Sequence, residues 1–232
     1  MAGGLHEWFV AEDRSRDSVW LAPMGVLIGL AWRVIEQEPR QRVVWVGRRC
    51  WPYPPALVRH GADGADCRLL DASVFVEPSS KGERVWAAEL AARCVGVGVV
   101  IGDGGGLAMA ESRRLQLASK STPLLLTRPA HEIRDLSAAR TRWRVSPLAV
   151  HETGGDRSQG WLVELLRCKG LQPSTLGDAR RWIVRRDYGT GLGTGRIQET
   201  WHRWSAGDGG VAAALGAGSD PASGSASITR IA

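Results

Sequence analysis

The stretch VGVVIGDGGG, residues 97–106, decides the fold class of this 232-residue chain. An apolar run of strand length ends at Asp103, and glycines follow it. Such a run is typical of a strand buried on both faces of a parallel sheet. In nucleotide hydrolases a strand of this kind delivers a carboxylate to the Mg²⁺ of ATP. Asp103 is therefore the first candidate site residue.

The same alternation of strands and helices continues on both sides of this stretch. Apolar runs predict strands at 4–10, 41–47, 72–78 and 123–129, and helices at 23–38, 81–95 and 107–121. We expect Val85, Leu90 and Val95 to form the apolar side of the helix over 81–95. Strands that alternate with helices in this way indicate an α/β domain with a mainly parallel central sheet.

The pattern changes after about residue 140. Partial alternation over 141–150, 160–168 and 180–187 predicts edge or antiparallel strands that finish the sheet. The run RIQETWHRW, residues 196–204, is compatible with a turn or two of helix, and 205–232 is rich in Gly, Ala and Ser. We therefore expect one domain over residues 1–188 and a flexible, largely disordered tail over 189–232.

Composition and charge limit the classes of protein to which this chain can belong. The formal net charge is +6 with 44% hydrophobic residues, which indicates a globular chain for which an acidic partner is plausible. The four cysteines form no CxxC pair, so we expect small buried side chains in a reducing, cytoplasmic location rather than a zinc site. The apolar stretch 19–32 is too short to span a bilayer and is interpreted as a buried helix.

An ATP site also needs a glycine-rich loop ending in Lys and Ser or Thr, between the first strand and its helix. The residues there, AEDRSRDSVWLAPMG over 11–25, contain no glycine before Gly25 and no lysine. Glu12, Asp13 and Asp17 would repel a triphosphate. We therefore expect no cofactor, interpret Asp103 as a turn-forming residue, and find no HExxH or GxSxG motif. The sequence predicts no metal site and no enzyme.

Tryptophan and arginine supply the remaining candidates. Of the eleven tryptophans, Trp45, Trp86, Trp143 and Trp182 are interpreted as core or groove residues. Trp201 and Trp204, near the tail, suit either a short docking peptide or a helix that packs back on the sheet. The candidate phosphate-binding residues are Arg113, Arg114, Arg140, Arg142, Arg180, Arg181, Arg185 and Arg186.

Several segments, taken in order, resemble ImuA-like proteins, which are RecA-fold accessories of the ImuB error-prone polymerase. These segments are GGLHEWF (3–9), VVWVGRRCWPYPPAL (43–57), RVWAAELAARC (84–94), VGVVIGD (97–103), ESRRLQLASKSTPLLLTRP (111–129), SAARTRWRVSP (137–147) and WLVELLRCKG (161–170). The resemblance implies a RecA-like three-layer fold in which Asp103 is a vestige of the Mg²⁺-binding carboxylate. Arg48 and Arg49 follow the strand that would end beside a water-activating Glu.

The resemblance further implies a non-catalytic protein of the DNA-damage response. Its expected partners are an ImuB-like Y-family polymerase subunit and a RecA-type recombinase, with DNA as a further candidate and no membrane. Three alternatives stay open. They are a SulA-like cell-division inhibitor that binds FtsZ, a basic nucleic-acid-binding module, and an ATPase in which Asp103 acts without the phosphate loop.

Overall fold

The computed structural model describes residues 3–10, 22–61, 64–148, 152–153, 156–171, 177, 180–188 and 197–203. The strands in this part of the chain are β1 (Gly4–Val10), β2 (Arg42–Val46), β3 (Arg59–Gly61), β4 (Gly64–Asp66), β5 (Ser73–Val76), β6 (Val97–Asp103), β7 (Pro123–Arg128), β8 (Thr141–Pro147), β9 (Glu152–Thr153), β10 (Asp156–Cys168), β11 (Arg181–Tyr188) and β12 (Ile197–Arg203).

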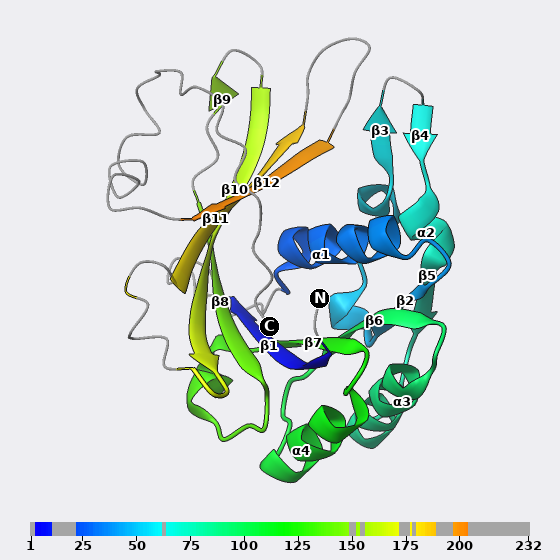
Figure 1. The fold of residues 1–232 in the computed structure, drawn as a ribbon, viewed down its shortest axis with the longest axis vertical. Coiled ribbons are helices and arrows are strands. Elements are labelled where there is room, and N and C mark those ends of the chain that lie inside the picture. Colours follow the sequence, from blue (N-terminus) through cyan, green and yellow to red (C-terminus); the bar gives the residue numbers. More distant parts are fainter. Residues whose placement is uncertain are drawn as a thin grey trace.

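One large sheet organises the molecule (Figure 1). Its strands follow the order β12-β11-β10-β8-β1-β7-β6-β2-β5, with β9 paired to β10, while β3 and β4 form a separate hairpin. The neighbours from β8 to β5 are parallel, and β10, β11 and β12 are antiparallel to their neighbours. The predicted fold class, α/β with a mainly parallel sheet and antiparallel strands at the C-terminal end, is confirmed.

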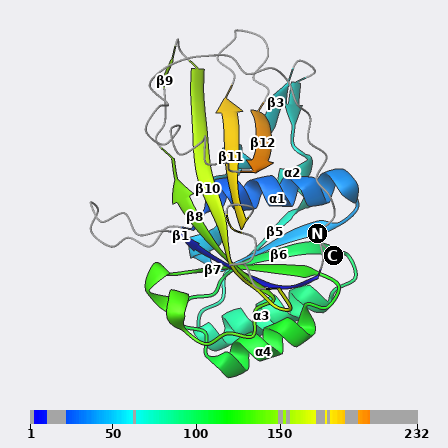
Figure 2. The same ribbon diagram turned by 60° about the vertical axis from the view of Figure 1, so that its left-hand side comes forward.

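Helices cover both faces of the parallel part of the sheet. They are α1 (Met24–Gln37), α2 (Arg68–Ala72), α3 (Lys81–Arg93) and α4 (Met109–Ala118). The 3₁₀ turns η1 (Arg48–Cys50) and η2 (Pro54–Leu57) follow β2, and η3 (Ala130–Arg134) follows β7. The helices α1 and α2 lie on one face, and α3 and α4 lie on the other (Figure 2). The described elements therefore form three layers.

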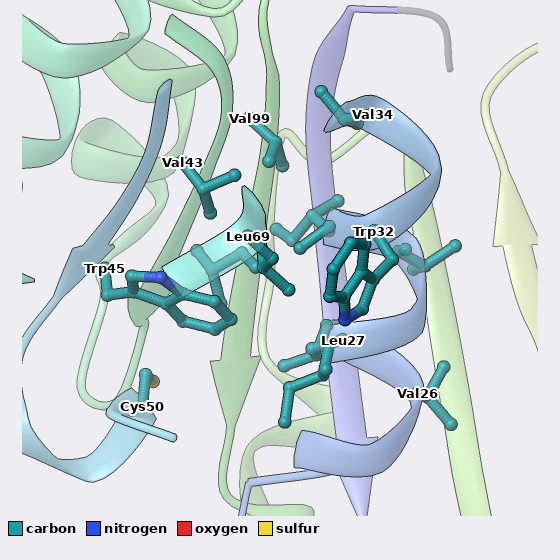
Figure 3. Packing of buried hydrophobic residues seen from close by; sticks show 14 of the residues in the cluster. Val26, Leu27, Trp32, Val34, Val43, Trp45, Cys50, Leu69 and Val99 are labelled. Carbon is teal, nitrogen blue, oxygen red and sulfur yellow. The ribbon is translucent and has the colours of Figure 1, made fainter. Parts of the chain in front are cut away.

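The helix α1 is buried on nearly all sides, as its sequence predicts. Figure 3 shows Trp32 of α1 packed toward Trp45 of β2 and Leu69 of α2, and these three side chains are almost wholly buried. The antiparallel end of the sheet packs against the first turn of α1. A Cβ on Gly25 there would lie 2.1 Å from Cζ2 of Trp161 in β10. No helix of the described residues is long and apolar enough to cross a membrane.

The buried face of α3 differs from the prediction. The helix begins after Ser80, whose Oγ accepts the N–H of Glu83 at 3.2 Å, and ends at Arg93. This frame buries Val85, Ala88 and Ala92. The expectation that Leu90 and Val95 join the apolar side is wrong, because Leu90 lies on the outer side of the helix and Val95 lies beyond its end.

Residues 197–203 are a strand, so the expected helical turn is wrong. The strand β12 pairs with β11 in antiparallel register, with Trp201 opposite Val184. The sheet therefore continues past residue 188, into the segment that we expected to be tail. Residues 204–232 lie outside the described part of the chain. The prediction for the cysteines holds for Cys50, which is buried, and is wrong for Cys94, which is exposed.

Candidate functional site

The carboxyl edge of the parallel strands is the place to search for a site, because open α/β sheets bind ligands there. Asp103 ends β6 with its side chain 5% exposed. Its Oδ2 lies 3.2 Å from Nη1 of Arg84 in α3, and its Oδ1 accepts the N–H of Gly105 at 2.9 Å. Arg84 also donates to the carbonyl of Gly105 at 2.7 Å.

These contacts decide what Asp103 does. The carboxylate closes the turn after β6, in agreement with the turn-forming interpretation, and the guanidinium of Arg84 lies where a cation would have to approach. A second positive charge at this position would be repelled. The arrangement around Asp103 therefore does not fit Mg²⁺ of a nucleotide, and we derive no catalytic step through such an ion.

A buried thiol lies next to this turn. Sγ of Cys50 is 2.9 Å from Oγ1 of Thr127, whose hydroxyl donates to the carbonyl of Gly102 at 3.3 Å. Burial raises the pKa of Cys50 to about 12, although the hydrogen bond between Cys50 and Thr127 opposes the shift. The thiol therefore stays protonated and does not provide a nucleophile or a thiolate ligand.

Two further cations at this edge have carboxylate partners. Arg48, which follows β2, pairs with Glu77 at 2.7 Å, and Lys81 pairs with Glu111 at 2.9 Å. Burial opposes the charge of Glu111, but the bonds from Lys81 and from the N–H of Ala108 outweigh it and lower the pKa of this carboxyl. The sequence correctly places Arg48 and Arg49 after β2, where neither can act as a general base.

An apolar pocket of about 410 Å³ opens beside the start of α1. Its lining includes Met24, Ile28, Trp51, Tyr53, Pro147 and Trp161, and none of the described residues that line it is charged. Tyr53 is 76% exposed at the surface of the molecule. The segment 11–21, where a phosphate loop belongs, lies outside the described residues. In the part of the chain that the structure describes, the first turn of α1 faces the aromatic and aliphatic side chains of this pocket.

A buried ionic network fastens β1, β7 and β8 together. Glu7 is wholly buried, and its carboxylate accepts hydrogen bonds from Nη1 of Arg128 at 2.9 Å, Nε of Arg142 at 2.8 Å and Oγ of Ser137 at 2.6 Å. Arg128 also pairs with Glu132 at 2.7 Å. Burial opposes the charge of Arg128, but Glu7 and Glu132 outweigh it and raise its pKa. Sequence reasoning missed this network, although Glu7 within an apolar strand is the signal that could have found it.

The candidate phosphate-binding arginines do not form one surface. Arg142 is buried on Glu7, so its assignment as a phosphate ligand is wrong. Arg140 donates to the carbonyl of Gly3 at 3.1 Å. Arg113 and Arg114 are exposed on α4, where Arg114 pairs with Glu89 of α3.

The remaining arginine candidates belong to the antiparallel end of the sheet. Arg180 and Arg181 surround Glu164 of β10, together with Arg144 of β8, which the sequence analysis did not single out. Arg185 lies further along β11. Arg186 also belongs to β11, but the position of its side chain lies outside what is described.

The tryptophan candidates have different surroundings. Trp45 is buried and donates to Oγ of Ser73 at 3.0 Å, and Trp143 stacks on Trp8 with ring centroids 5.4 Å apart. Trp143 also packs against the core around α1, which confirms it as a core or groove residue, and the ring of half-buried Trp182 lies 5.5 Å from that of Trp143. Trp86 is 57% exposed on α3, so its assignment to the core is wrong.

For the two tryptophans near the tail, Trp201 belongs to the paired strand β12, and Trp204 lies outside the described residues. A group of three or more His, Cys, Asp and Glu side chains able to hold a metal ion does not occur among the residues that the structure describes.

No protein-family model matches this sequence, and no curated protein matches it.

Proposed function

We propose that this chain is a non-catalytic, RecA-like accessory protein of the DNA-damage response. In this proposal it acts in SOS mutagenesis and translesion synthesis, in the cytoplasm, by binding an ImuB-type polymerase and a RecA-type recombinase. The ordered segments that resemble ImuA-like proteins, from GGLHEWF to WLVELLRCKG, point to these partners.

The observation that carries the proposal is the chemistry at the carboxyl edge of the sheet. An ATPase of this architecture uses that edge for a triphosphate and Mg²⁺. Here Asp103 is bound to Arg84, and the start of α1 borders an apolar pocket. Aromatic side chains such as Tyr53 and Trp51 are typical anchors of protein–protein contacts. This edge is better suited to a partner's apolar side chain than to a nucleotide.

The test is an affinity pull-down of the tagged full chain from DNA-damaged cells of its own organism, with bound proteins identified by mass spectrometry. A double variant, Met24→Gln with Tyr53→Ala, removes two apolar side chains from the pocket. Leu136→Ala is the matched control, because Leu136 is 79% exposed and does not line the pocket. We expect the wild type and the control to recover a Y-family-like polymerase or the recombinase, and the double variant to recover less.

Other results would overturn the proposal or its assignment of the pocket. Recovery of FtsZ with neither of these partners would favour the SulA-like division inhibitor. Equal recovery by the double variant would refute the pocket as the binding site, but not the proposed partners. Co-purification of nucleic acid alone would contradict a function in protein–protein contact. A variant pair, Trp201→Ala and Trp204→Ala, tests the docking hypothesis for these residues, which unchanged partner recovery would refute.

A further inference from the structure

Three arginines converge on one carboxylate at the antiparallel end of the sheet. Glu164 of β10 has its side chain 5% exposed, and it pairs with Arg144 of β8, with Arg180 at 3.1 Å and with Arg181 of β11 at 3.3 Å. The three arginine side chains remain 44%, 31% and 30% exposed. Their guanidinium groups therefore keep N–H donors at the surface while Glu164 fixes their positions.

Strand register places a fourth arginine on the same face. Glu164 is opposite both Arg144 and Arg181, so these three side chains share one face of the sheet. Arg185 follows Arg181 by four residues and therefore returns to that face, about 13 Å further along β11. The strand that carries Arg144, β8, is two strand spacings from β11, which is a distance of about 10 Å. We call Arg144, Arg180, Arg181 and Arg185 the arginine face.

The charge of the arginine face is unbalanced. Arg144, Arg180 and Arg181 pair with one carboxylate, Glu164, and strand alternation places one further acidic residue, Asp187, on the same face two residues after Arg185. Burial alone would raise the pKa of Glu164. The guanidinium of Arg144, followed by those of Arg180 and Arg181, outweighs the effect of burial, so the pKa of Glu164 is lowered. Glu164 is therefore ionised at neutral pH. Four arginines and two acidic residues leave a net excess of two positive charges on and beside a patch of about 13 by 10 Å.

No described helix packs on this face of the antiparallel strands, although Ile183, which lies on it between Arg181 and Arg185, is only 2% exposed. On that side of the sheet, α3 and α4 pack on β6, β2, β7 and β1 (Figures 1 and 2). The opposite face of the same strands carries Trp161, Val163 and Val184, which join the core around α1. The described positions of the arginine face bear no aromatic side chain, because Trp143 and Trp182 alternate to the core side.

We propose that the arginine face binds the phosphodiester backbone of nucleic acid, without reading its bases. A polymer with a negative charge on every unit can contact several of these guanidiniums at once, and each planar fork can bond two phosphate oxygens. The lack of stacking side chains restricts the contact to the backbone. This proposal is independent of the partner proteins proposed above.

The test measures fluorescence anisotropy of labelled single-stranded and duplex oligonucleotides with the full chain over a range of salt concentrations. The test variant is Arg144→Gln with Arg185→Gln. The matched control is Arg40→Gln with Arg93→Gln, which removes the same charge from exposed positions after α1 and on α3. A single-strand phosphate contact contributes a salt slope of about 0.7, or about fivefold in affinity at 0.1 M salt. Loss of two contacts should therefore weaken binding about 25-fold and reduce the slope by about 1.4.

The expected result is salt-sensitive binding that the test variant loses and the control keeps, and the probe that binds more tightly identifies the preferred strand form. Thermal unfolding checks that the variants fold; if the double variant does not, Arg185→Gln alone replaces it and should lose about fivefold. Absence of binding at low salt, or an equal loss in the control, would overturn the proposal. So would displacement of the oligonucleotide by polyglutamate at the same concentration of charge, which would indicate an acidic protein as the ligand.

Discussion

Replacing Glu7 by Gln should destabilise the fold more than any surface change of the same kind. Glutamine keeps the shape of the side chain but removes the negative charge between Arg128 and Arg142, whose side chains are 0% and 9% exposed. Removal of one partner from a buried ion pair costs about 3–5 kcal/mol. Because Glu132 still pairs with Arg128, we expect the lower end, about 3 kcal/mol. A domain of this size then loses about 6–12 °C in melting temperature.

The assay is urea unfolding, with calorimetry for the melting temperature. Glu77→Gln is the matched control, because Glu77 pairs with Arg48 at the surface and its loss should change stability by less than about 0.5 kcal/mol. Adding Arg142→Gln to Glu7→Gln should restore part of the loss, since it removes one uncompensated charge. A loss below about 1 kcal/mol for Glu7→Gln would refute the view that this network holds the three strands together.

Three further changes test other parts of the structure. Gly25→Ala should destabilise the protein by about 1–3 kcal/mol in urea unfolding, because a Cβ would overlap the indole of Trp161. Gly82→Ala on α3 should not destabilise it, because a Cβ there would lie no closer than 3.9 Å to Oγ of Ser80. Equal effects would contradict the close packing of α1. The pKa of Glu164 is lower in the folded state than in the unfolded state. The ionised carboxylate therefore contributes its full stabilisation above the ordinary glutamate pKa, about 4.3, and this stabilisation is lost as the pH falls below that value. Acid unfolding of Glu164→Gln should accordingly be less steep than that of the wild type. Iodoacetamide at pH 8 should label exposed Cys94 and spare buried Cys50, and equal labelling of the native protein would contradict the raised pKa of Cys50.

The parallel part of the fold could be predicted from the sequence because its signals are local. A continuous apolar run such as VVWV, residues 43–46, is long enough for one strand and is bounded by charges or glycine. The same holds for the strand that ends at Asp103. Pro23 and the apolar residues after it likewise mark the start and the buried surroundings of α1.

The faces of individual elements and the end of the sheet were harder to predict, since both depend on contacts between distant segments. Leu90 and Ala88 differ in exposure because of where α3 begins, and not because of their hydrophobicity. The strand β12 forms because β11 offers an unpaired edge, and this edge is not visible in the residues 197–203 themselves.

The charged groups of the candidate sites show the same limit. Asp103 and its glycines predicted a turn, and the structure agrees. The partner of Asp103, Arg84, comes from another element and carries no signal in the local sequence. For the same reason the sequence led us to choose Arg142 as a phosphate ligand instead of Arg144, although Arg142 is buried on Glu7 and Arg144 is exposed.

The central claim is that the carboxyl edge of the sheet does not hold a nucleotide. The most direct test is the melting temperature of the full chain titrated with Mg²⁺ and ATP. A ligand of the folded state at 100 times its Kd stabilises by about 2.7 kcal/mol, which for this length is about 5–11 °C. We predict no shift at millimolar ATP. A saturable rise in melting temperature that requires both Mg²⁺ and ATP would contradict the claim.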